Sequence, residues 1–301
     1  MPDGTQSAQL TTLLSNDVLT RIGQLRINAF RRFTNRSHGE HLSGKGGGSI
    51  EFADYRDYVP GDDVRFVDWN IFSRLHRPYV KLYHEEEVMH VVICVDASES
   101  MTPDGKLERA RQLGAAFAVM GLFGTERVSV YAFNDACAQP ARLAPRGGRG
   151  HMGTVFRFIE GIEAGGSAPV EEGVAAALSR HVGRGVAVLL SDFLTFGDLR
   201  RPFNLLQSAG LEVFAVQILS PAEIDPEVNG DVRLVDCETF QTLDISGAEQ
   251  LLSIYDEYRE AFQRRLEDTA RGHSGRFLAI DSQAPIEWVL FDLFRRRGWV
   301  R

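Results

Sequence analysis

The chain is poor in cysteine and has no long apolar run. Its 301 residues include only three cysteines. Cys94, Cys137 and Cys237 show no CxxC spacing, which argues against a disulfide framework or a cysteine zinc site and favours a reducing compartment. No apolar stretch approaches the roughly 20 residues of a membrane-spanning helix, and the N-terminus lacks the basic start and apolar core of a signal peptide. We therefore expect a cytoplasmic protein without a membrane span.

Basic residues are fewer than acidic ones, 33 against 41. The formal net charge is −8 and the isoelectric point is near 5.5, whereas nucleic-acid binding requires a basic face that displaces counterions. We therefore expect no nucleic-acid partner. The hydrophobic fraction of 44% and the charged fraction of 25% are typical of a globular protein with a packed core.

The sequence pattern changes near residue 90, from an irregular segment to regularly alternating apolar runs. This change predicts domains over 1–90 and 91–301. The first contains a predicted helix from about Asp17 to Phe33, a glycine-rich loop and an aromatic segment typical of short strands and turns. Around Pro60-Gly61 lie several charged residues that predict a network of ion pairs and turns, with a partner-recognition surface as the alternative. These are Asp62, Asp63, Arg65 and Asp68.

From residue 91 onward, strands and helices alternate. The apolar runs VVICVD (91–96), RVSVYAF (127–133), VAVLLSD (186–192) and LEVFAVQIL (211–219) are typical of strands, and the first, third and fourth of buried strands in a parallel sheet. With helices between them, they predict an α/β fold whose crossovers are right-handed. The tail predicts a β-hairpin over 232–246 and a long amphipathic helix from about Gly247. We expect that helix to turn its apolar side chains inward, namely Leu251, Tyr255, Tyr258 and Phe262.

Two of the buried strands end in an aspartate, Asp96 and Asp192. Ligands of open parallel sheets bind outside the carboxyl ends of strands where the winding reverses, so these carboxylates are expected to face each other across a small crevice. Mutual repulsion there raises the pKa of one or recruits a cation. Ser98 and Ser100 add hydroxyls at alternate positions, and such an oxygen cluster suits Mg²⁺ or Mn²⁺.

Simpler interpretations exist for these residues. Asp96, Ser98 and Ser100 are also favoured at the N-termini of helices, and Asp192 alone is equally typical of a turn. Three oxygen-bearing residues at alternate positions, together with a second aspartate at a strand end, favour the metal site.

The Asp96-Ala-Ser98-Glu-Ser100 motif resembles the metal-ion-dependent adhesion site of von Willebrand factor A domains. The resemblance implies a von Willebrand factor A-like, Rossmann-type parallel sheet flanked by helices, with an N-terminal β-rich extension and a C-terminal hairpin-helix extension. It also implies that Asp192 and a residue of a middle loop complete the site. Ser167, in Gly165-Gly166-Ser167, occupies the place of the usual threonine, but the residues after it depart from the motif.

A longer resemblance begins at about Ser43. The block EFADYRDYVPGDDVRFVDWNIFSRLHRPYVKLYHEEE, which leads to VDASESM, is similar to the signature of the bacterial domain of unknown function 58 family. This resemblance implies a metal-dependent protein-binding module that works with a MoxR-type AAA+ ATPase in protein assembly or maturation. The partner, the ATPase or its client, would supply an acidic residue to the metal. No catalytic residues are expected.

The alternative is a metal-dependent phosphotransfer enzyme or hydrolase with Asp96 as nucleophile. Such enzymes need a lysine beyond the nucleophile to neutralise phosphoryl charge, and no lysine follows Lys106. The second acid of an Asp-x-Asp motif is replaced by Ser98. The sequence also lacks a P-loop and a Gly-x-Ser-x-Gly motif. These features favour the binding module.

Overall fold

The structure is a computed structural model that describes residues 9–29, 34–36, 50–86, 88–134, 139–195, 197–227, 230–237, 241–246 and 251–301. The chain divides into two compact units. We call Met1–Phe30 together with His90–Arg301 the sheet unit, and Arg31–Met89 the small unit. The expected boundary near residue 90 coincides with the end of the small unit, whereas the N-terminal helix belongs to the sheet unit.

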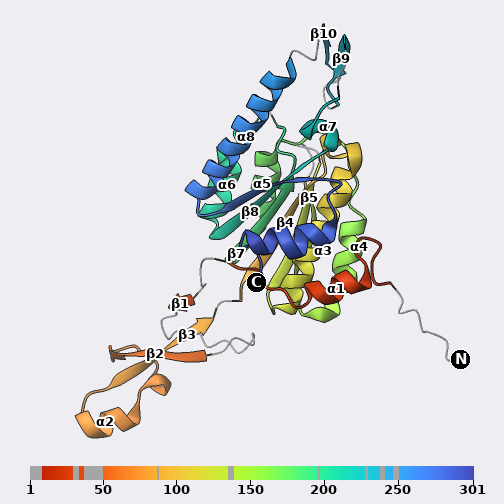
Figure 1. Cartoon of the computed structure of the whole chain (residues 1–301). Coiled ribbons are helices and arrows are strands. Elements are labelled where there is room, and N and C mark those ends of the chain that lie inside the picture. Colours follow the sequence, from red (N-terminus) through yellow and green to blue (C-terminus); the bar gives the residue numbers. More distant parts are fainter. Residues whose placement is uncertain are drawn as a thin grey trace, which may run out of the picture. The chain divides into compact units, whose positions relative to one another are not determined.

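The sheet unit is built on a central, mostly parallel six-stranded sheet flanked by helices (Figure 1). Its strands run in the order β11-β8-β7-β4-β5-β6, and only β6 is antiparallel to its neighbour. Strand β4 is the first of these six strands in the sequence and β7 is the fourth, yet the two are paired in the sheet. The chain adds strands on one side of β4 before β7 and on the other side from β7 onward, so the winding reverses between β4 and β7. The strands are β4 (His90–Asp96), β5 (Arg127–Phe133), β6 (Ala141–Gly147), β7 (Gly185–Ser191), β8 (Leu211–Leu219) and β11 (Arg276–Asp281).

The predicted apolar runs form the centre of this sheet. Every residue of β7 and β8 is buried, as are all but the first of β4, because helices cover both faces. No apolar pattern predicted β6, whose ARLAPRG segment is largely exposed and pairs only with β5. Proline and arginine are tolerated at an edge strand, and there they remove the apolar pattern by which a strand is detected.

Helices on the two faces use alternate residues of the central strands. On one face, α3 packs against Ile93 and Leu190, which contact the place where a Cβ on Gly114 would stand. On the other, Val92 and Leu189 share an apolar cluster with residues of α5, α6 and α8. The helices are α3 (Lys106–Phe123), α4 (Met152–Glu160), α5 (Val170–Leu178), α6 (Arg200–Ser208) and α8 (Leu252–Gly272), with α9 (Ile286–Trp288), η6 (Val289–Leu293) and α10 (Phe294–Arg296) at the C-terminus.

The N-terminal helix is shorter than predicted. Helix α1 (Asn16–Ile22) ends at Gly23, so the expectation of a helix to Phe33 was wrong over its described part. Beyond it, Ile27 forms an antiparallel bridge with Val300. Leu25 and Ile27 are buried, as their apolar character predicts. They lie in an extended segment that pairs with the C-terminus, and not in a continued helix.

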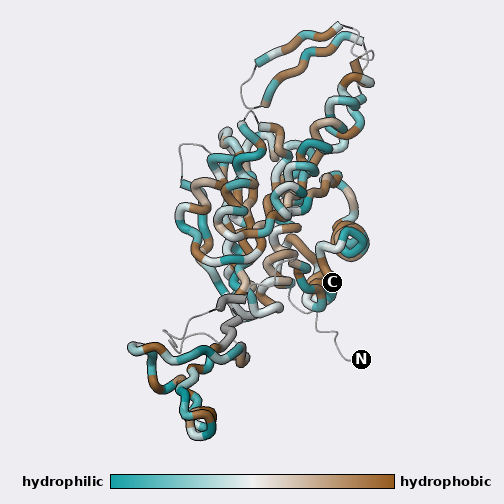
Figure 2. Tube along the Cα trace, turned by 90° about the vertical axis from the view of Figure 1, so that its left-hand side faces the viewer, coloured by the Kyte–Doolittle hydropathy of each residue, from teal (hydrophilic) through white to brown (hydrophobic). Residues whose placement is uncertain are grey.

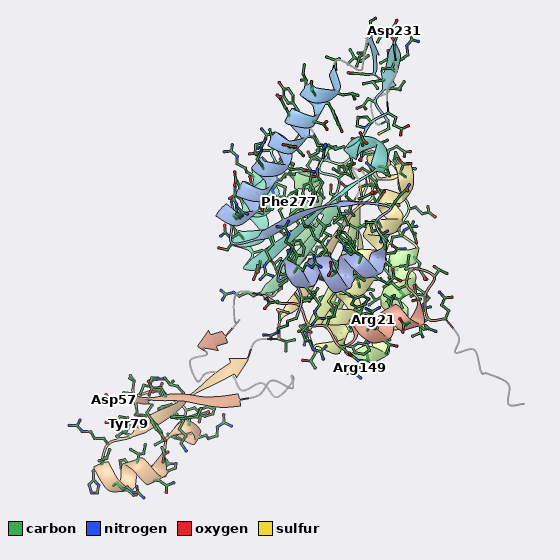
Figure 3. The ribbon with its side chains drawn as sticks, in the orientation of Figure 1. Arg21, Asp57, Tyr79, Arg149, Asp231 and Phe277 are labelled. Carbon is green, nitrogen blue, oxygen red and sulfur yellow. The ribbon has the colours of Figure 1, made fainter. Side chains whose placement is uncertain are left out.

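The small unit contains a three-stranded antiparallel sheet in the order β1-β3-β2. Figure 3 labels Asp57 and Tyr79, which face each other at the ends of β2 and β3. The predicted network of ion pairs and turns is confirmed: Arg56 holds Asp62 through two 2.7 Å bonds, and Asp68 caps helix α2. The elements are β1 (Thr34–Arg36), β2 (Ile50–Asp57), η1 (Val64–Phe66), α2 (Trp69–Leu75) and β3 (Tyr79–Glu86).

The tail contains the predicted hairpin, formed by β9 (Val232–Val235) and β10 (Thr242–Ile245) after a short helix α7 (Pro221–Ile224). Helix α8 is also confirmed. Its predicted orientation was wrong in the first turns, because Leu251, Tyr255 and Tyr258 are 43%, 39% and 75% exposed. Along the described ranges, no helix combines the length and the apolar character that crossing a membrane requires.

Candidate metal site

The structure brings Asp96 and Asp192 to the same edge of the sheet. Asp96 is the last residue of β4, and Asp192 directly follows the neighbouring strand β7. Both carboxylates are only 2% exposed. The Ser191 hydroxyl links the two strand ends by donating a 2.6 Å hydrogen bond to Asp96 Oδ2. This edge is where the winding of the sheet reverses, which is the usual position of a ligand site.

The three oxygens of the Asp96-x-Ser98-x-Ser100 motif lie in contact. Ser98 Oγ lies 2.8 Å from Asp96 Oδ1 and 3.0 Å from Ser100 Oγ. Adjacent ligands of an octahedral Mg²⁺ ion, each about 2.1 Å from the metal, are separated by about 3 Å. The spacing of these oxygens therefore fits two edges of an octahedron, and the motif residues suit a hard divalent cation.

The simpler interpretations hold in part. The backbone N–H of Ser98 donates to Asp96 Oδ1, and that of Leu194 donates to Asp192 Oδ1, so both aspartates also stabilise turns. In contrast, Ser98 precedes η2 (Glu99–Met101) without making a capping hydrogen bond with its side chain. N-capping therefore does not explain the serine hydroxyls of the motif.

The loop that contains Ser167 lies against the Asp96 loop. The N–H of Gly165 donates to the Ala97 carbonyl and that of Glu99 donates to the Gly166 carbonyl, each at 2.9 Å. Ser167 follows directly and is exposed. The structure therefore brings the middle loop against the Asp96 loop, and the role of the exposed Ser167 as a ligand stays a prediction.

A lysine that the sequence analysis did not assign to the site lies beside Asp192. Lys106 is 1% exposed, and its Nζ donates to Asp192 Oδ2 at 2.9 Å and to Glu223 Oε1 at 2.6 Å. Glu223 is itself held by a capping box with Ser220 at the start of α7. The Ser220-Pro-Ala-Glu223 sequence was a detectable signal for that box, but no local pattern connects it to Lys106, which is 117 residues away.

Burial and repulsion dominate the electrostatics of these groups. Desolvation, reinforced by the charge of Asp192, raises the pKa of Asp96 from 3.8 to about 7. Desolvation acts to lower the pKa of Lys106, but Asp192 and Glu223 outweigh it and the pKa is raised. The site therefore holds three carboxyl groups and one firmly charged ammonium, which leaves an excess of negative charge when all are ionised.

Carboxylates alone do not make a metal centre here. Among the residues that the structure describes, no group of three or more His, Cys, Asp or Glu side chains is placed to hold a metal ion. A cation at Asp96 would depend on the serine hydroxyls and on water for the remaining ligands, a combination that suits Mg²⁺ better than a transition metal.

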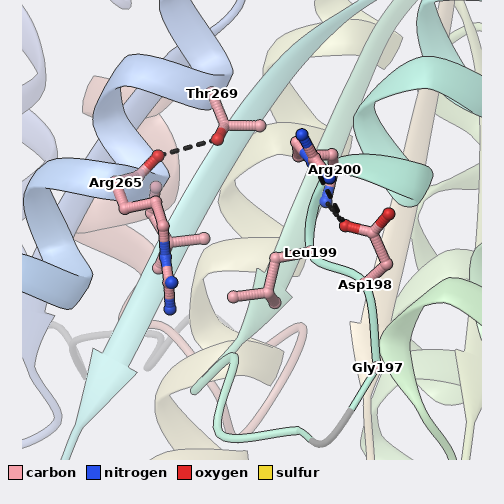
Figure 4. A pocket seen from close by; sticks show the side chains of 7 residues that line it. Gly197, Asp198, Leu199, Arg200, Arg265 and Thr269 are labelled. Atoms are coloured by element: carbon pink, nitrogen blue, oxygen red, sulfur yellow. Dashed lines mark hydrogen bonds and ion pairs between the residues drawn. The ribbon is translucent and has the colours of Figure 1, made fainter.

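A separate pocket lies between the loop before α6 and helix α8 (Figure 4). Its volume is about 480 Å³. Leu199 and the buried Leu266 lie in its lining, as do Arg200 and Asp198, which form an ion pair. None of the candidate metal ligands lines this pocket.

Comparisons with known proteins identify relatives without assigning them an activity. The model of the family described as "Protein of unknown function DUF58" matches residues 54–270. The uncharacterized protein Rv1480 of Mycobacterium tuberculosis is 29% identical over 270 residues, which cover 87% of this chain and 84% of that protein. The uncharacterized protein MAV169 of Mycobacterium avium is 32% identical over 117 residues, 38% of this chain and 69% of that protein.

Solved structures give a more distant likeness. The conserved hypothetical protein BatB from Bacteroides thetaiotaomicron matches with a TM-score of 0.41 and 14% identity, over 69% of this chain and 98% of that one. The pilus adhesin SpaC from Lactobacillus rhamnosus GG matches with a TM-score of 0.43 and 13% identity, over 71% of this chain and 30% of that one.

Proposed function

The chain belongs to the DUF58 family of proteins of unknown function, and from that premise we propose that it is a metal-dependent protein-binding module. Mg²⁺ or Mn²⁺ binds to Asp96, Ser98, Ser100, Ser167 and Asp192, directly or through water. One coordination position stays open, and an acidic side chain of a partner protein fills it.

The observation that carries this proposal is the cluster of oxygens around Ser98. Its hydroxyl has Asp96 Oδ1 and Ser100 Oγ at 2.8 and 3.0 Å, the separation of adjacent octahedral ligands. The excess of buried carboxyl groups over cations adds an electrostatic reason for a divalent ion to bind. When bound, the ion supplies Lewis acidity towards an incoming carboxylate. The protein's own residues hold it in place and exclude water from one side.

The sequence resemblance suggests which protein the partner is. We propose a MoxR-type AAA+ ATPase, or a client that such an ATPase assembles or matures. Co-purification of the tagged chain with the ATPase from its own host, with and without EDTA, tests this partner. Equal recovery under both conditions would argue against recognition through a metal.

The metal itself is tested by isothermal titration of Mg²⁺ or Mn²⁺ into the wild type, Asp96→Ala and Asp63→Ala. Asp63 lies in the small unit and pairs with Arg65, so Asp63→Ala is a matched control for loss of a carboxylate. We expect binding heat from the wild type and Asp63→Ala, and none from Asp96→Ala. Equal heats from all three proteins would remove the site.

One observation favours the alternative enzyme. Lys106, the last lysine of the chain, lies at Asp192, so the lack of a lysine beyond it no longer separates this site from phosphotransfer sites. A phosphatase assay with p-nitrophenyl phosphate and an ATPase assay decide between the two functions. Metal-dependent turnover that Asp96→Ala abolishes would favour the enzyme, and absence of turnover in a protein that binds Mg²⁺ would favour the binding module.

A further inference from the structure

The apolar side of helix α8 is buried near the C-terminus of the helix and exposed in its first turns. Near its C-terminus, Leu266 and Ala270 are fully buried against the sheet unit. In the first turns, Leu251, Ile254 and Tyr258 follow the spacing of three and four that places side chains on one helix face, yet they are 43%, 49% and 75% exposed. The apolar side chains in this part of the helix are therefore left uncovered by the described residues.

The β9–β10 hairpin presents a second set of exposed apolar side chains. Leu234 and Leu243 are directly opposite each other in the strand register and are 48% and 60% exposed, and Val235 is 57% exposed. Figures 1 and 2 both place the hairpin beside the first turns of α8, and Figure 2 shows apolar stretches along each. We call the following side chains the apex surface: Leu234, Leu243, Leu251, Ile254 and Tyr258. Val235 follows Leu234 in the strand and therefore lies on the other face of the hairpin.

The apex surface lies in the most acidic segment of the chain. Residues 221–260 contain eleven acidic and two basic residues, a formal charge of −9, against −8 for the whole protein. Both basic residues are already paired, Arg233 with Asp244 and Arg259 with Asp256. Apolar side chains in strongly acidic surroundings attract an apolar partner that carries positive charge.

We propose that the apex surface binds a basic amphipathic segment of a partner protein, whose apolar face covers the exposed leucines and whose lysines or arginines meet the surrounding carboxylates. The charge selects this occupant. A second copy of the chain would bring −9 against −9, and nucleic acid or an anionic membrane would meet the same repulsion. An amphipathic helix in an apolar groove is a common mode of recognition.

The helix that carries part of the apex surface is also connected to the candidate metal site. Tyr255, the residue after Ile254, donates from its hydroxyl to the Glu223 carbonyl at 2.5 Å. The Glu223 carboxylate accepts from Lys106, which also donates to Asp192. The inference rests on the proposed function only in taking the partner to be a protein, because apolar contact and charge require no metal.

The test uses fluorescence anisotropy of the full chain with three labelled peptides of about 14 residues. One has leucines at helical spacing and lysines elsewhere, the second replaces lysine with glutamate, and the third has the composition of the first with leucines in non-periodic positions. We expect the wild type to bind the first peptide and to bind the other two at least about tenfold more weakly, because loss of the charge attraction or of the helical periodicity each removes about 1.4 kcal/mol, the free energy of a tenfold change in affinity.

Variants locate the binding on the molecule. Each of two double variants should weaken binding of the first peptide about tenfold, because each removes two apolar contacts that the bound peptide would bury. These variants are Leu234→Ser/Leu243→Ser and Ile254→Ser/Tyr258→Ser. Val182→Ser is the matched control, since Val182 is 86% exposed but lies outside the apex surface, and it should bind as the wild type does. Far-ultraviolet circular dichroism confirms that each variant is folded.

Asp96→Ala separates this inference from the metal proposal. It should bind the first peptide as the wild type does, even if it loses Mg²⁺. Equal binding of lysine and glutamate peptides, or unchanged binding by both apex variants, would overturn the inference. So would a wild-type dimer in light scattering that Leu234→Ser/Leu243→Ser converts to a monomer, because the apex surface would then bind a second copy.

Discussion

Two clusters of acidic residues in this protein differ in whether each carboxylate has a cationic partner. In the small unit, Asp62, Asp63 and Asp68 each have a cation of their own, which is Arg56, Arg65 and Lys81 respectively. Hydrogen bonding to Arg65 lowers the pKa of Asp63, and hydrogen bonding to Lys81 lowers that of Asp68. These carboxylates are fully compensated within their own unit.

At the end of the sheet, three carboxyl groups lie beside a single lysine that pairs with only two of them. Lys106 contacts Asp192 and Glu223, whereas Asp96 receives only hydroxyl and backbone N–H donors, and burial raises its pKa to about 7. The carboxylates of the small unit are therefore neutralised by their own cations. The carboxyl groups at the end of the sheet outnumber their single cation, which favours the binding of an additional positive charge.

The largest expected effect comes from removing the shared lysine. Lys106→Met leaves Asp192 buried without its cation, and loss of one partner of a buried ion pair costs about 3–5 kcal/mol. Urea unfolding in EDTA measures the loss. Arg65→Met is the control: Arg65 and its partner Asp63 are 81% and 31% exposed, so loss of this pair should cost much less. Equal losses in the two variants would remove the contrast between the clusters.

Metal should compensate for the missing ammonium. We expect saturating Mg²⁺ to raise the melting temperature of Lys106→Met by more than that of the wild type, because a divalent ion at Asp96 and Asp192 restores the lost positive charge. Differential scanning fluorimetry with and without Mg²⁺ provides the readout. No Mg²⁺ effect on either protein would show that Lys106 alone completes the site.

The second effect is a dependence of stability on pH. Because the pKa of Asp96 is about 7 in the folded protein and near 3.9 in an unfolded chain, the folded state binds an extra proton between these values. The free energy of unfolding should therefore fall as pH rises from about 4 to about 7, by up to roughly 4 kcal/mol. Asp96→Asn should remove this part of the slope.

Urea titrations in EDTA at several pH values compare wild type with Asp96→Asn. The difference between them isolates Asp96 from carboxyl groups whose pKa is lowered, such as Glu160, which contribute with the opposite sign. Parallel pH profiles would show that Asp96 titrates as an ordinary carboxyl group, and the two clusters would then no longer differ.

The smallest effect concerns the middle loop. Ser167→Thr keeps the hydroxyl and should change the Mg²⁺ affinity by only a few-fold, whereas Ser98→Ala removes the central oxygen of the cluster and should weaken binding by about tenfold or more, roughly 1.4 kcal/mol. Isothermal titration measures both. An equal loss of Mg²⁺ affinity in the two variants would show that Ser167 contributes as much to binding as Ser98 does. The proposed position of the ion would then be wrong.

Sequence patterns predicted the parts of the molecule that local physics determines. Continuous apolar runs predicted the buried strands, and the strand-end positions of Asp96 and Asp192 predicted their approach, because parallel strands share an edge. The Lys106–Glu223 pair and edge strand β6 were missed. The first depends on a contact across 117 residues, and the second carries no apolar alternation. Amphipathic spacing predicted α8 but could not reveal that its first turns extend past the core.

The bridge between Ile27 and Val300 has a consequence for the architecture of the chain. Backbone hydrogen bonds between Arg26 and Arg301, at 2.9 and 3.0 Å in the two directions, tie the segment before the small unit to the C-terminus of the sheet unit. The small unit is thus an insertion whose entry and exit both belong to one scaffold. We therefore expect the sheet unit to keep its fold when the small unit is replaced by a short linker.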